Sequence, residues 1–287
     1  MTYLRDEIAS QPSVWERALS VSTAALPKAG DRVAVIGCGT SYYMAQAYAA
    51  LRESTGQGET DAFAASEFPA ARRYDRVLAL TRSGTTTEVL AALTRTTAPT
   101  VAITADPATP ISNAADAVVS LEFADEKSVV QTRFATTALV LLRASLGEDL
   151  TGLPAAATTE LATPLPQELL DATQWTFLGT GWTLGLANEA ALKLREATQS
   201  WTESYYAMEY RHGPISIAAP GRVVWLLGPT PPNLPEDVRR TGAYVETSVG
   251  DPLVSLVRAH RVAEAIAQAR GLDADHPRNL DRSVILQ

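Results

Sequence analysis

The stretch VAVIGCGTS at residues 33–41 is an apolar run that ends in a glycine-rich turn. A continuous apolar run is typical of a strand buried on both faces, as in a parallel sheet covered by helices. A helix that starts after such a turn presents free N–H groups to an anion. Position 42 is Tyr, so the stretch is not the G-x-G-x-x-G dinucleotide fingerprint, and no G-K-[ST] follows as in a P-loop. Taken alone, a tight turn with Thr40 or Ser41 as the helix N-cap would explain it equally well.

Apolar runs of the same kind recur along the first half of the chain. They lie at residues 77–80, 101–103 and 118–121, and helix-length segments lie at 42–53 and 86–96. Buried strands that alternate with helices predict an α/β fold with a parallel sheet flanked by helices, in three αβα layers.

The opening pattern returns after a proline-rich stretch. WTFLGTGWT at residues 175–183 again joins an apolar run to G-x-G-x-[ST], close to half the chain length after the first copy. Residues 147–166 contain three prolines among alanines and threonines and are predicted to be a linker. Further strands are expected at 223–227 and 243–245, a surface turn at 229–235 and a helix at 258–270. The repeat predicts two domains, residues 1–155 and 156–287.

Composition narrows the classes of protein. The formal net charge of −8 argues against nucleic acid as the main partner, and Cys38, the only cysteine, excludes a disulfide framework or a cysteine metal cluster. Residues 1–19 are predicted to form a short amphipathic helix rather than a leader, and no apolar run approaches membrane-spanning length. A cytoplasmic protein with no membrane partner is expected.

The stretch TRSGTTTE at residues 81–88 follows a predicted strand directly. It gathers five hydroxyl groups and one arginine at the carboxyl end of that strand, the edge where open α/β sheets bind ligands. Hydroxyls and helix N–H groups together can hold a phosphate without a large basic patch. A capping box between Thr85 and Glu88 also fits the spacing. Both interpretations are expected to hold.

Three charged residues share one face of a predicted helix. Glu189, Lys193 and Glu196 lie at i, i+4 and i+7, a spacing that often marks a solvated stripe of ion pairs. Their helix follows the second glycine-rich turn, and His212-Gly213-Pro214 comes shortly afterwards. A carboxylate and a histidine are what ring opening and C1–C2 proton transfer require, so this group is a candidate catalytic set.

Five segments, in order over nearly the whole chain, resemble the double-SIS (sugar isomerase) proteins. These include the isomerase domain of glucosamine-6-phosphate synthase and the SIS-type amino-sugar-phosphate deaminases. The segments are GTS at 39–41, SGTT at 83–86, EAALKLRE at 189–196, EYRHGP at 209–214 and PRNL at 277–280. The resemblance implies two tandem SIS domains, each a parallel sheet flanked by helices, with a sugar phosphate held mainly by the first.

The resemblance also implies roles for residues. The substrate-binding residues would be Cys38, Gly39, Thr40, Ser41, Thr81, Arg82, Ser83, Thr86, Val130 and Gln131. The catalytic set would be Glu196, His212, Lys193 and Arg282. Glu196 would move a proton between C1 and C2, and His212 would assist ring opening in the neighbouring subunit's site, which implies a homodimer. The tail around Arg282 would close over the ligand, and no metal or organic cofactor would be needed.

The sequence departs from the synthase in three ways. No glutaminase domain or cysteine follows Met1, so glutamine is not expected to supply ammonia in this chain. Arg282 stands where the synthase has a tail lysine that forms a Schiff base, and an arginine cannot form that imine. It would be left to clamp an oxyanion or the phosphate. Gln131 stands where the synthase has serine.

The predicted function is therefore an isomerase or deaminase of a hexose or amino-sugar 6-phosphate, acting by C1–C2 proton transfer. Two alternatives remain. A fructosamine-phosphate deglycase would share the fold, and a sugar-phosphate sensor without catalysis would use the same binding site.

Overall fold

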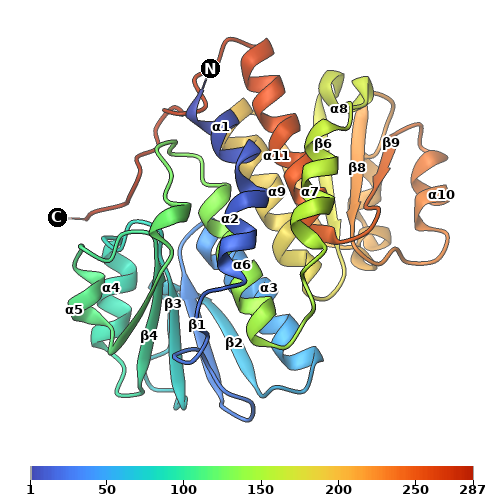
Figure 1. The fold of residues 1–287 in the computed structure, drawn as a ribbon. Helices are drawn as coiled ribbons and strands as arrows, with labels where there is room; N and C mark the ends of the chain where they lie inside the picture. The colour runs from blue at the N-terminus through green and yellow to red at the C-terminus, as the bar shows by residue number, and fades with distance from the viewer. Residues whose placement is uncertain (1, 287) are drawn as a thin grey trace.

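The structure is a computed structural model that describes residues 2–286, and it contains two parallel sheets with helices between and around them (Figure 1). The strands are β1 (Val33–Gly37), β2 (Thr60–Ala64), β3 (Arg76–Leu80), β4 (Thr100–Thr104), β5 (Ala117–Ser120), β6 (Gln174–Gly179), β7 (Thr202–Tyr206), β8 (Arg222–Leu227) and β9 (Tyr244–Thr247). The α-helices are α1 (Tyr3–Ala9), α2 (Gln11–Ala18), α3 (Thr40–Ser54), α4 (Thr87–Thr94), α5 (Ile111–Ala114), α6 (Arg133–Ser145), α7 (Leu153–Ala162), α8 (Gln167–Asp171), α9 (Thr183–Thr198), α10 (Leu234–Arg239) and α11 (Pro252–Ala269). Short 3-10 helices are η1 (Ala65–Glu67), η2 (Glu122–Ala124), η3 (Glu209–His212) and η4 (Pro214–Ile217).

The first sheet has the strand order β2-β1-β3-β4-β5, and all its neighbours pair in parallel. The apolar runs predicted as strands form β1, β3 and β4, and the run predicted at 118–121 forms β5 one residue earlier. β2 was not predicted, because this edge strand carries polar residues and only its first residue is fully buried. The parallel αβα arrangement expected for this half is confirmed.

The strands of both sheets divide their side chains between a shared core and an outer cluster. In β1, Val33 and Val35 belong to the large core, and Ala34 and Ile36 belong to a smaller cluster under α4 and α5. In the second sheet, Trp225 of β8 likewise faces the large core, with the flanking strand residues on a third cluster. This alternation follows from the two-residue repeat of a strand. One continuous core therefore lies between the two sheets.

The second sheet has the order β7-β6-β8-β9 and is also entirely parallel. β6, β8 and β9 correspond to the predicted runs, whereas the edge strand β7, with its sequence TESYY, was not predicted. The predicted helix at 258–270 is α11, which begins six residues earlier, at Pro252. The surface turn predicted at 229–235 gives way to α10 at Leu234.

The prediction of a linker at residues 147–166 is wrong for the middle of that stretch. Residues 153–162 form α7, with a proline in its first turn, where a missing N–H is tolerated. The boundary predicted between residues 155 and 156 falls inside this helix, and the division into two domains stays a prediction. An ion pair joins α7 to α11 of the second half. The Arg258 guanidinium donates to both carboxylate oxygens of the buried Glu160, at 3.0 and 2.7 Å.

The chain start also differs from expectation. Two helices, α1 and α2, replace the single predicted one, because the chain turns at Ser10, which is the C-cap of α1 and the N-cap of α2. The carboxylate of Asp275 accepts the N–H groups of Tyr3 and Leu4, both at 2.8 Å. The N-cap of α1 is Thr2, and the first turn of the helix is thus also bound by a residue from the C-terminal segment. Met1 lies outside the described residues.

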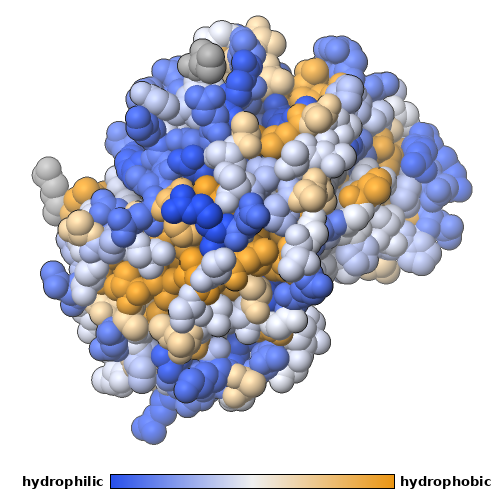
Figure 2. All heavy atoms as spheres, viewed as in Figure 1, coloured by the Kyte–Doolittle hydropathy of each residue, from blue (hydrophilic) through white to orange (hydrophobic). Residues whose placement is uncertain are grey.

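Removing the Arg258 guanidinium is expected to destabilise the fold. Arg258 joins Glu160 to Glu246, at 2.6 Å, and both carboxylates are buried. Arg258→Met would leave Glu246 without this partner, so the free energy of unfolding in urea should fall by about 3 kcal/mol. Arg239→Met breaks an exposed pair with Glu236 on α10, whose outer side is hydrophilic in Figure 2, and should cost about 0.5 kcal/mol or less. Equal losses for the two variants would contradict this role of Arg258.

Candidate active site

The first glycine-rich turn joins β1 to α3 at the carboxyl edge of the first sheet. Gly39 is the N-cap of α3, so the prediction of Thr40 or Ser41 as the cap is wrong. Thr40 and Ser41 begin the helix instead, and both are buried. Gly39 is exposed and Cys38 is half-buried. Burial raises the pKa of the Cys38 thiol to about 11, with a smaller effect of Glu88, so the thiol stays protonated near neutral pH.

The hydroxyl-rich loop, residues 81–86, follows β3, the neighbour of β1 in the sheet. Gly84 has φ 64°, and a Cβ there would meet the Thr109 hydroxyl at 2.0 Å, so only glycine fits the turn. The Thr81 hydroxyl accepts the Gly84 N–H at 3.2 Å and shapes the loop. Thr86 is the N-cap of α4 without a side-chain bond, which makes the predicted capping box of Thr85 with Glu88 wrong. The Thr86 hydroxyl is left free of any cap bond.

The C-terminal tail lies on this hydroxyl loop. The Ser283 hydroxyl accepts hydrogen bonds from Ser83 at 3.1 Å and from Thr85 at 2.9 Å. The Thr87 N–H donates to the Val284 carbonyl at 3.2 Å, at the start of α4. Ser283 therefore forms hydrogen bonds with Ser83, which was predicted to bind the sugar phosphate, and with the neighbouring Thr85.

α9 carries its three charged residues from the second half to the first turn. The Lys193 ammonium donates to the Thr40 hydroxyl at 2.9 Å and to Glu196 at 2.5 Å, and lies 3.5 Å from Glu189. Glu189 and Lys193 are no more than 1% exposed, so the solvated stripe of ion pairs is excluded. The contact is close because Gly185 of α9 packs on the backbone of α3, where a Cβ would meet the Tyr43 carbonyl at 2.5 Å.

Burial and charge set the protonation of this cluster. Burial raises the pKa of Glu189 to about 8, against the opposing effect of Lys193. Burial lowers the pKa of Lys193, but Glu189 and Glu196 more than offset this, and the net pKa is raised above its usual value. Lys193 is therefore an ammonium, a proton donor rather than a nucleophile. Glu196 remains the accessible carboxylate, with its side chain 18% exposed.

Two arginines join the hydroxyl loop, the tail and the loop before α6. Arg82 is buried, and its guanidinium donates to the Ser128 carbonyl at 2.9 Å and to the Arg282 carbonyl at 2.6 Å. Burial lowers the pKa of Arg82 from its usual value. The Arg282 guanidinium in turn donates to Asp125 at 2.6 Å and to the Glu126 carbonyl. The tail is thus tied to the site at both its backbone and its side chain.

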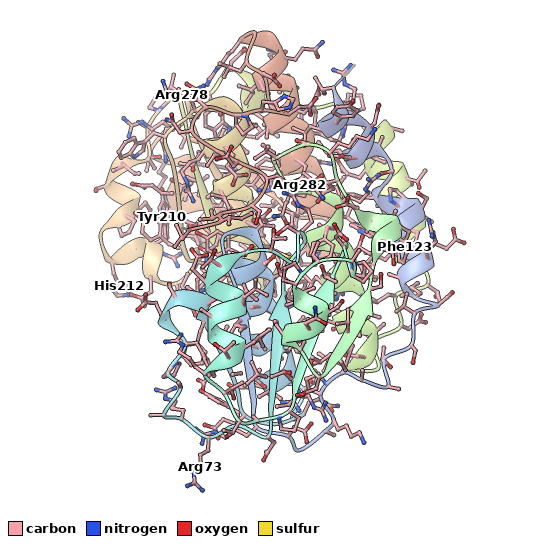
Figure 3. All side chains as sticks on the ribbon, turned by 90° about the vertical axis from the view of Figure 1, so that its left-hand side faces the viewer. Arg73, Phe123, Tyr210, His212, Arg278 and Arg282 are labelled. Atoms are coloured by element: carbon pink, nitrogen blue, oxygen red, sulfur yellow. The ribbon has the colours of Figure 1, made fainter. Side chains whose placement is uncertain are left out.

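The remaining predicted site residues, Val130, Gln131 and His212, differ in burial. Val130 is buried in the loop before α6, and the adjacent Gln131 has a buried amide oxygen without a partner among the described residues. His212 lies in η3 and is exposed; Figure 3 shows it at the edge of the molecule, whereas Arg282 lies near the middle. None of the hydrogen bonds of the Lys193 cluster among the described residues involves His212.

The second glycine-rich turn is internally satisfied. The Thr183 hydroxyl accepts the Thr180 N–H at 2.8 Å and donates to the Leu227 carbonyl at 2.6 Å. The Thr183 hydroxyl is thus used in hydrogen bonds to the backbone of the turn and of β8, and the candidate site lies at the first turn. Among residues 2–286, no cluster of three or more His, Cys, Asp or Glu side chains could hold a metal ion, and no helix could cross a membrane.

Sequence reasoning missed three residues of the site. Ser283, Thr85 and Asp125 contact the hydroxyl loop or the tail, but Ser283 and Asp125 were assigned no role and Thr85 only a role in helix capping. Thr85 carried a signal, because it lies within the hydroxyl run itself. Ser283 lies about 200 positions along the chain from its partners, and no local pattern records such a contact.

The comparisons with known proteins show which family and which folds this chain resembles. Residues 26–146 match the model of the SIS domain family. The chain is 28% identical to the glutamine–fructose-6-phosphate aminotransferase of Methanothermobacter thermautotrophicus, over 99% of this chain and 58% of that protein. It is 29% identical to the enzyme of the same name from Gloeobacter violaceus, over 90% of this chain and 52% of that protein. The chain spans about half the length of the curated relatives it matches.

Solved structures share the fold over the whole chain. Glucosamine-6-phosphate deaminase from Thermotoga maritima has a TM-score of 0.80 at 23% identity, covering 99% of this chain and 100% of that one. Tagatose-6-phosphate ketose/aldose isomerase from Escherichia coli has a TM-score of 0.82 at 18% identity, covering 97% and 98%. The expectation of two tandem SIS domains needs correction, because the family match covers one domain only. Residues 26–146 thus match the SIS domain family, and they are followed by a second parallel sheet within a fold similar to that of these two structures.

Proposed function

We propose that this protein binds a hexose or amino-sugar 6-phosphate at the carboxyl edge of its first sheet and moves a proton between C1 and C2. The observation that carries the proposal is the contact of Lys193 with Thr40 and Glu196. It brings an acid/base pair from α9 beside the turn after β1, next to the hydroxyl loop. A phosphate anchor and a proton-transfer pair at one sheet edge are what this reaction needs.

In the proposed reaction Glu196 is the base. Its carboxylate removes the proton from C2 of the open-chain aldose and returns it to C1, through an enediol or an enolamine. The Lys193 ammonium donates a proton toward the substrate oxygen that becomes negative. With a 2-amino sugar the product is a 2-imine, which water hydrolyses to the ketose and ammonia. The same residues therefore serve an isomerase or a deaminase.

The phosphate is assigned to the hydroxyl loop. Ser83 and Thr86 would donate to phosphate oxygens, with Ser41 at the neighbouring turn, and the start of α4 would add backbone N–H groups. Ser283 holds the Ser83 and Thr85 hydroxyls without a ligand, so binding is proposed to replace these bonds. Cys38, Gly39, Thr81, Arg82, Val130 and Gln131 would shape the pocket around the sugar.

A Schiff-base route is not proposed. Arg282 cannot form an imine, and Lys193, the lysine of the cluster, is held as an ammonium chiefly by Glu196, at 2.5 Å. The reaction of the named relatives also uses glutamine, and the chain spans only about half of their length. Arg282 is instead assigned to closing the tail over the ligand.

A homodimer is the proposed assembly, with His212 completing the site of the neighbouring subunit. The support is that His212 is exposed and follows the exposed Tyr206 and Met208 closely in the sequence. Exposed aromatic and methionine side chains are typical of interfaces between subunits. Sedimentation at micromolar concentration is expected to give a dimer. A stable monomer that still turns over substrate would contradict the role of His212.

The function is tested by a turnover screen with three candidate substrates. These are glucosamine 6-phosphate, fructose 6-phosphate with ammonia, and a fructosamine 6-phosphate. Release of ammonia from the first, or formation of an aldose phosphate from the second, would support the proposal. Turnover of the third alone would favour the deglycase.

A binding protein without catalysis is the second candidate. It is favoured by one observation, the engagement of the Arg282 guanidinium by Asp125 and the Glu126 carbonyl, which leaves the tail without a reactive group. Ligand binding with no turnover of any of the three substrates would support this candidate.

A further inference from the structure

Glu7 is a buried carboxylate of α1 outside the proposed catalytic set. It is 4% exposed, and its Oε1 atom accepts the N–H groups of Lys127 at 2.5 Å and Ser128 at 3.4 Å. Its Oε2 atom has no hydrogen-bond partner among the described residues. A buried carboxylate is costly unless it is hydrogen-bonded, so the charged form of Glu7 depends on the two N–H groups of this loop.

The loop that Glu7 holds, residues 125–129, is the connector of the site. On its other side it accepts Arg82 through the Ser128 carbonyl and Arg282 through the Glu126 carbonyl and the Asp125 carboxylate. Arg82 belongs to the hydroxyl loop, and Arg282 belongs to the tail. The connector therefore lies between α1 and both parts of the proposed phosphate site.

The connector is also bound to the segment that leads into the tail. The Val129 N–H donates to the Asp275 carbonyl at 3.0 Å, and the Ser128 hydroxyl donates to the Ala274 carbonyl at 3.3 Å. The Asp275 carboxylate binds the first turn of α1. The start of the chain, the connector and the base of the tail thus form one hydrogen-bonded unit.

The charges around Glu7 come from the connector and from α6. Glu126 repels it and Arg133 attracts it, while Lys127 places its ammonium over the ring of Tyr3. Burial, followed by Glu126, raises the pKa of Glu7 to about 7, against the two backbone N–H groups of the connector. Those two N–H groups are therefore the main stabilisation of the charged carboxylate. In turn, the carboxylate holds the backbone of residues 127 and 128 in place.

We propose that Glu7 is a positioning residue, which holds residues 125–129 in the shape that keeps Arg282 and the tail over the hydroxyl loop. This inference rests on the proposed function only in its consequence for affinity. The tie between α1 and the tail exists without any ligand. A change at the first helix would thereby change ligand affinity at a site it does not contact.

Hydrogen–deuterium exchange of the ligand-free protein is the test. In Glu7→Ala, the amides at 127–129 and the amide of Leu286, which donates to the Thr87 hydroxyl at 3.0 Å, should exchange about tenfold faster or more, whereas those of β3 should be unchanged. Glu7→Gln keeps a neutral acceptor oxygen and should lie between Glu7→Ala and the wild type. If Glu7→Ala fails to fold, the exchange rates of Glu7→Gln are compared with those of the wild type instead.

The matched control is Arg5→Met on the same helix. Arg5 joins α1 to Glu264 of α11, at 3.0 Å, without touching the connector. It should leave exchange of the Leu286 amide unchanged. Equal acceleration of the tail in Arg5→Met and Glu7→Ala, or a tail unchanged in Glu7→Ala, would overturn the proposal.

Affinity gives the second readout. Binding of glucosamine 6-phosphate should weaken about tenfold in Glu7→Ala, because losing the closure of the tail by Arg282 outweighs the easier release of Ser283 from the hydroxyl loop. The turnover rate at saturation should change by less than about threefold. A fall in the saturated rate with unchanged affinity would contradict a positioning role. If the wild type does not bind this ligand, the proposed function fails, and the exchange result still decides the role of Glu7.

Discussion

Glu196→Gln is expected to lower turnover by about a thousandfold or more, since removing a general base costs two to four orders of magnitude. The amide cannot accept the substrate proton, but its oxygen can still accept the 2.5 Å bond from Lys193. The fold and the neighbouring hydroxyls should therefore stay in place, and affinity for the sugar phosphate should change by less than about threefold. Steady-state kinetics and calorimetry on the same protein measure the two quantities.

The control for Glu196→Gln is Glu236→Gln, an exposed carboxylate of α10. It should match the wild type in both quantities. Turnover of Glu196→Gln within about threefold of the wild type would remove Glu196 from the role of base. Equal losses of affinity and of saturated rate would instead indicate a damaged site.

Replacing two hydroxyls of the phosphate loop should weaken binding of phosphorylated sugars about a hundredfold. Ser83→Ala with Thr86→Ala removes two hydrogen bonds to a charged group, each worth about 1.5 kcal/mol or more. Free glucosamine, which lacks the phosphate, should lose less than about threefold. Calorimetry for the phosphorylated ligand and NMR titration for the free sugar make the comparison.

Thr94→Ala is the matched control for this double variant. Its hydroxyl lies at the other end of α4 and bonds only to the Ala91 carbonyl, at 2.9 Å. It should leave both affinities unchanged. Equal weakening of the phosphorylated and the free sugar by the double variant would remove the phosphate from the hydroxyl loop.

The sequence predicted the strands that are buried on both faces. β1, β3 and β4 have continuous apolar runs because helices cover each side of the sheet. The edge strands β2 and β7 were missed, because polar residues on their exposed sides hide the pattern of a strand. The α7 stretch was taken for a linker, since its prolines and alanines carry little periodic signal and its stability comes from packing and from Arg258.

In the candidate site, too, local patterns predicted some residues and missed the contacts between distant segments. Ser83, Thr86 and Ser41 were predictable because they follow strands directly, and parallel strands bring their carboxyl ends to one edge. The meeting of Lys193 with Thr40 follows from the packing of α9 on α3, which no local pattern records. The hydrogen bonds of Ser283 to the hydroxyl loop and of Glu7 to residues 127 and 128 likewise join segments that are distant in the sequence.

Deuterium exchange during turnover is the most direct test of proton transfer between C1 and C2. The wild-type protein is incubated in deuterated water with fructose 6-phosphate and with glucosamine 6-phosphate, and the carbon-bound protons are followed by NMR. We expect deuterium at C1 of the ketose or at C2 of the aldose, and no incorporation with Glu196→Gln. Binding of both sugar phosphates by the wild type without any incorporation would contradict catalysis and leave a sugar-phosphate-binding protein.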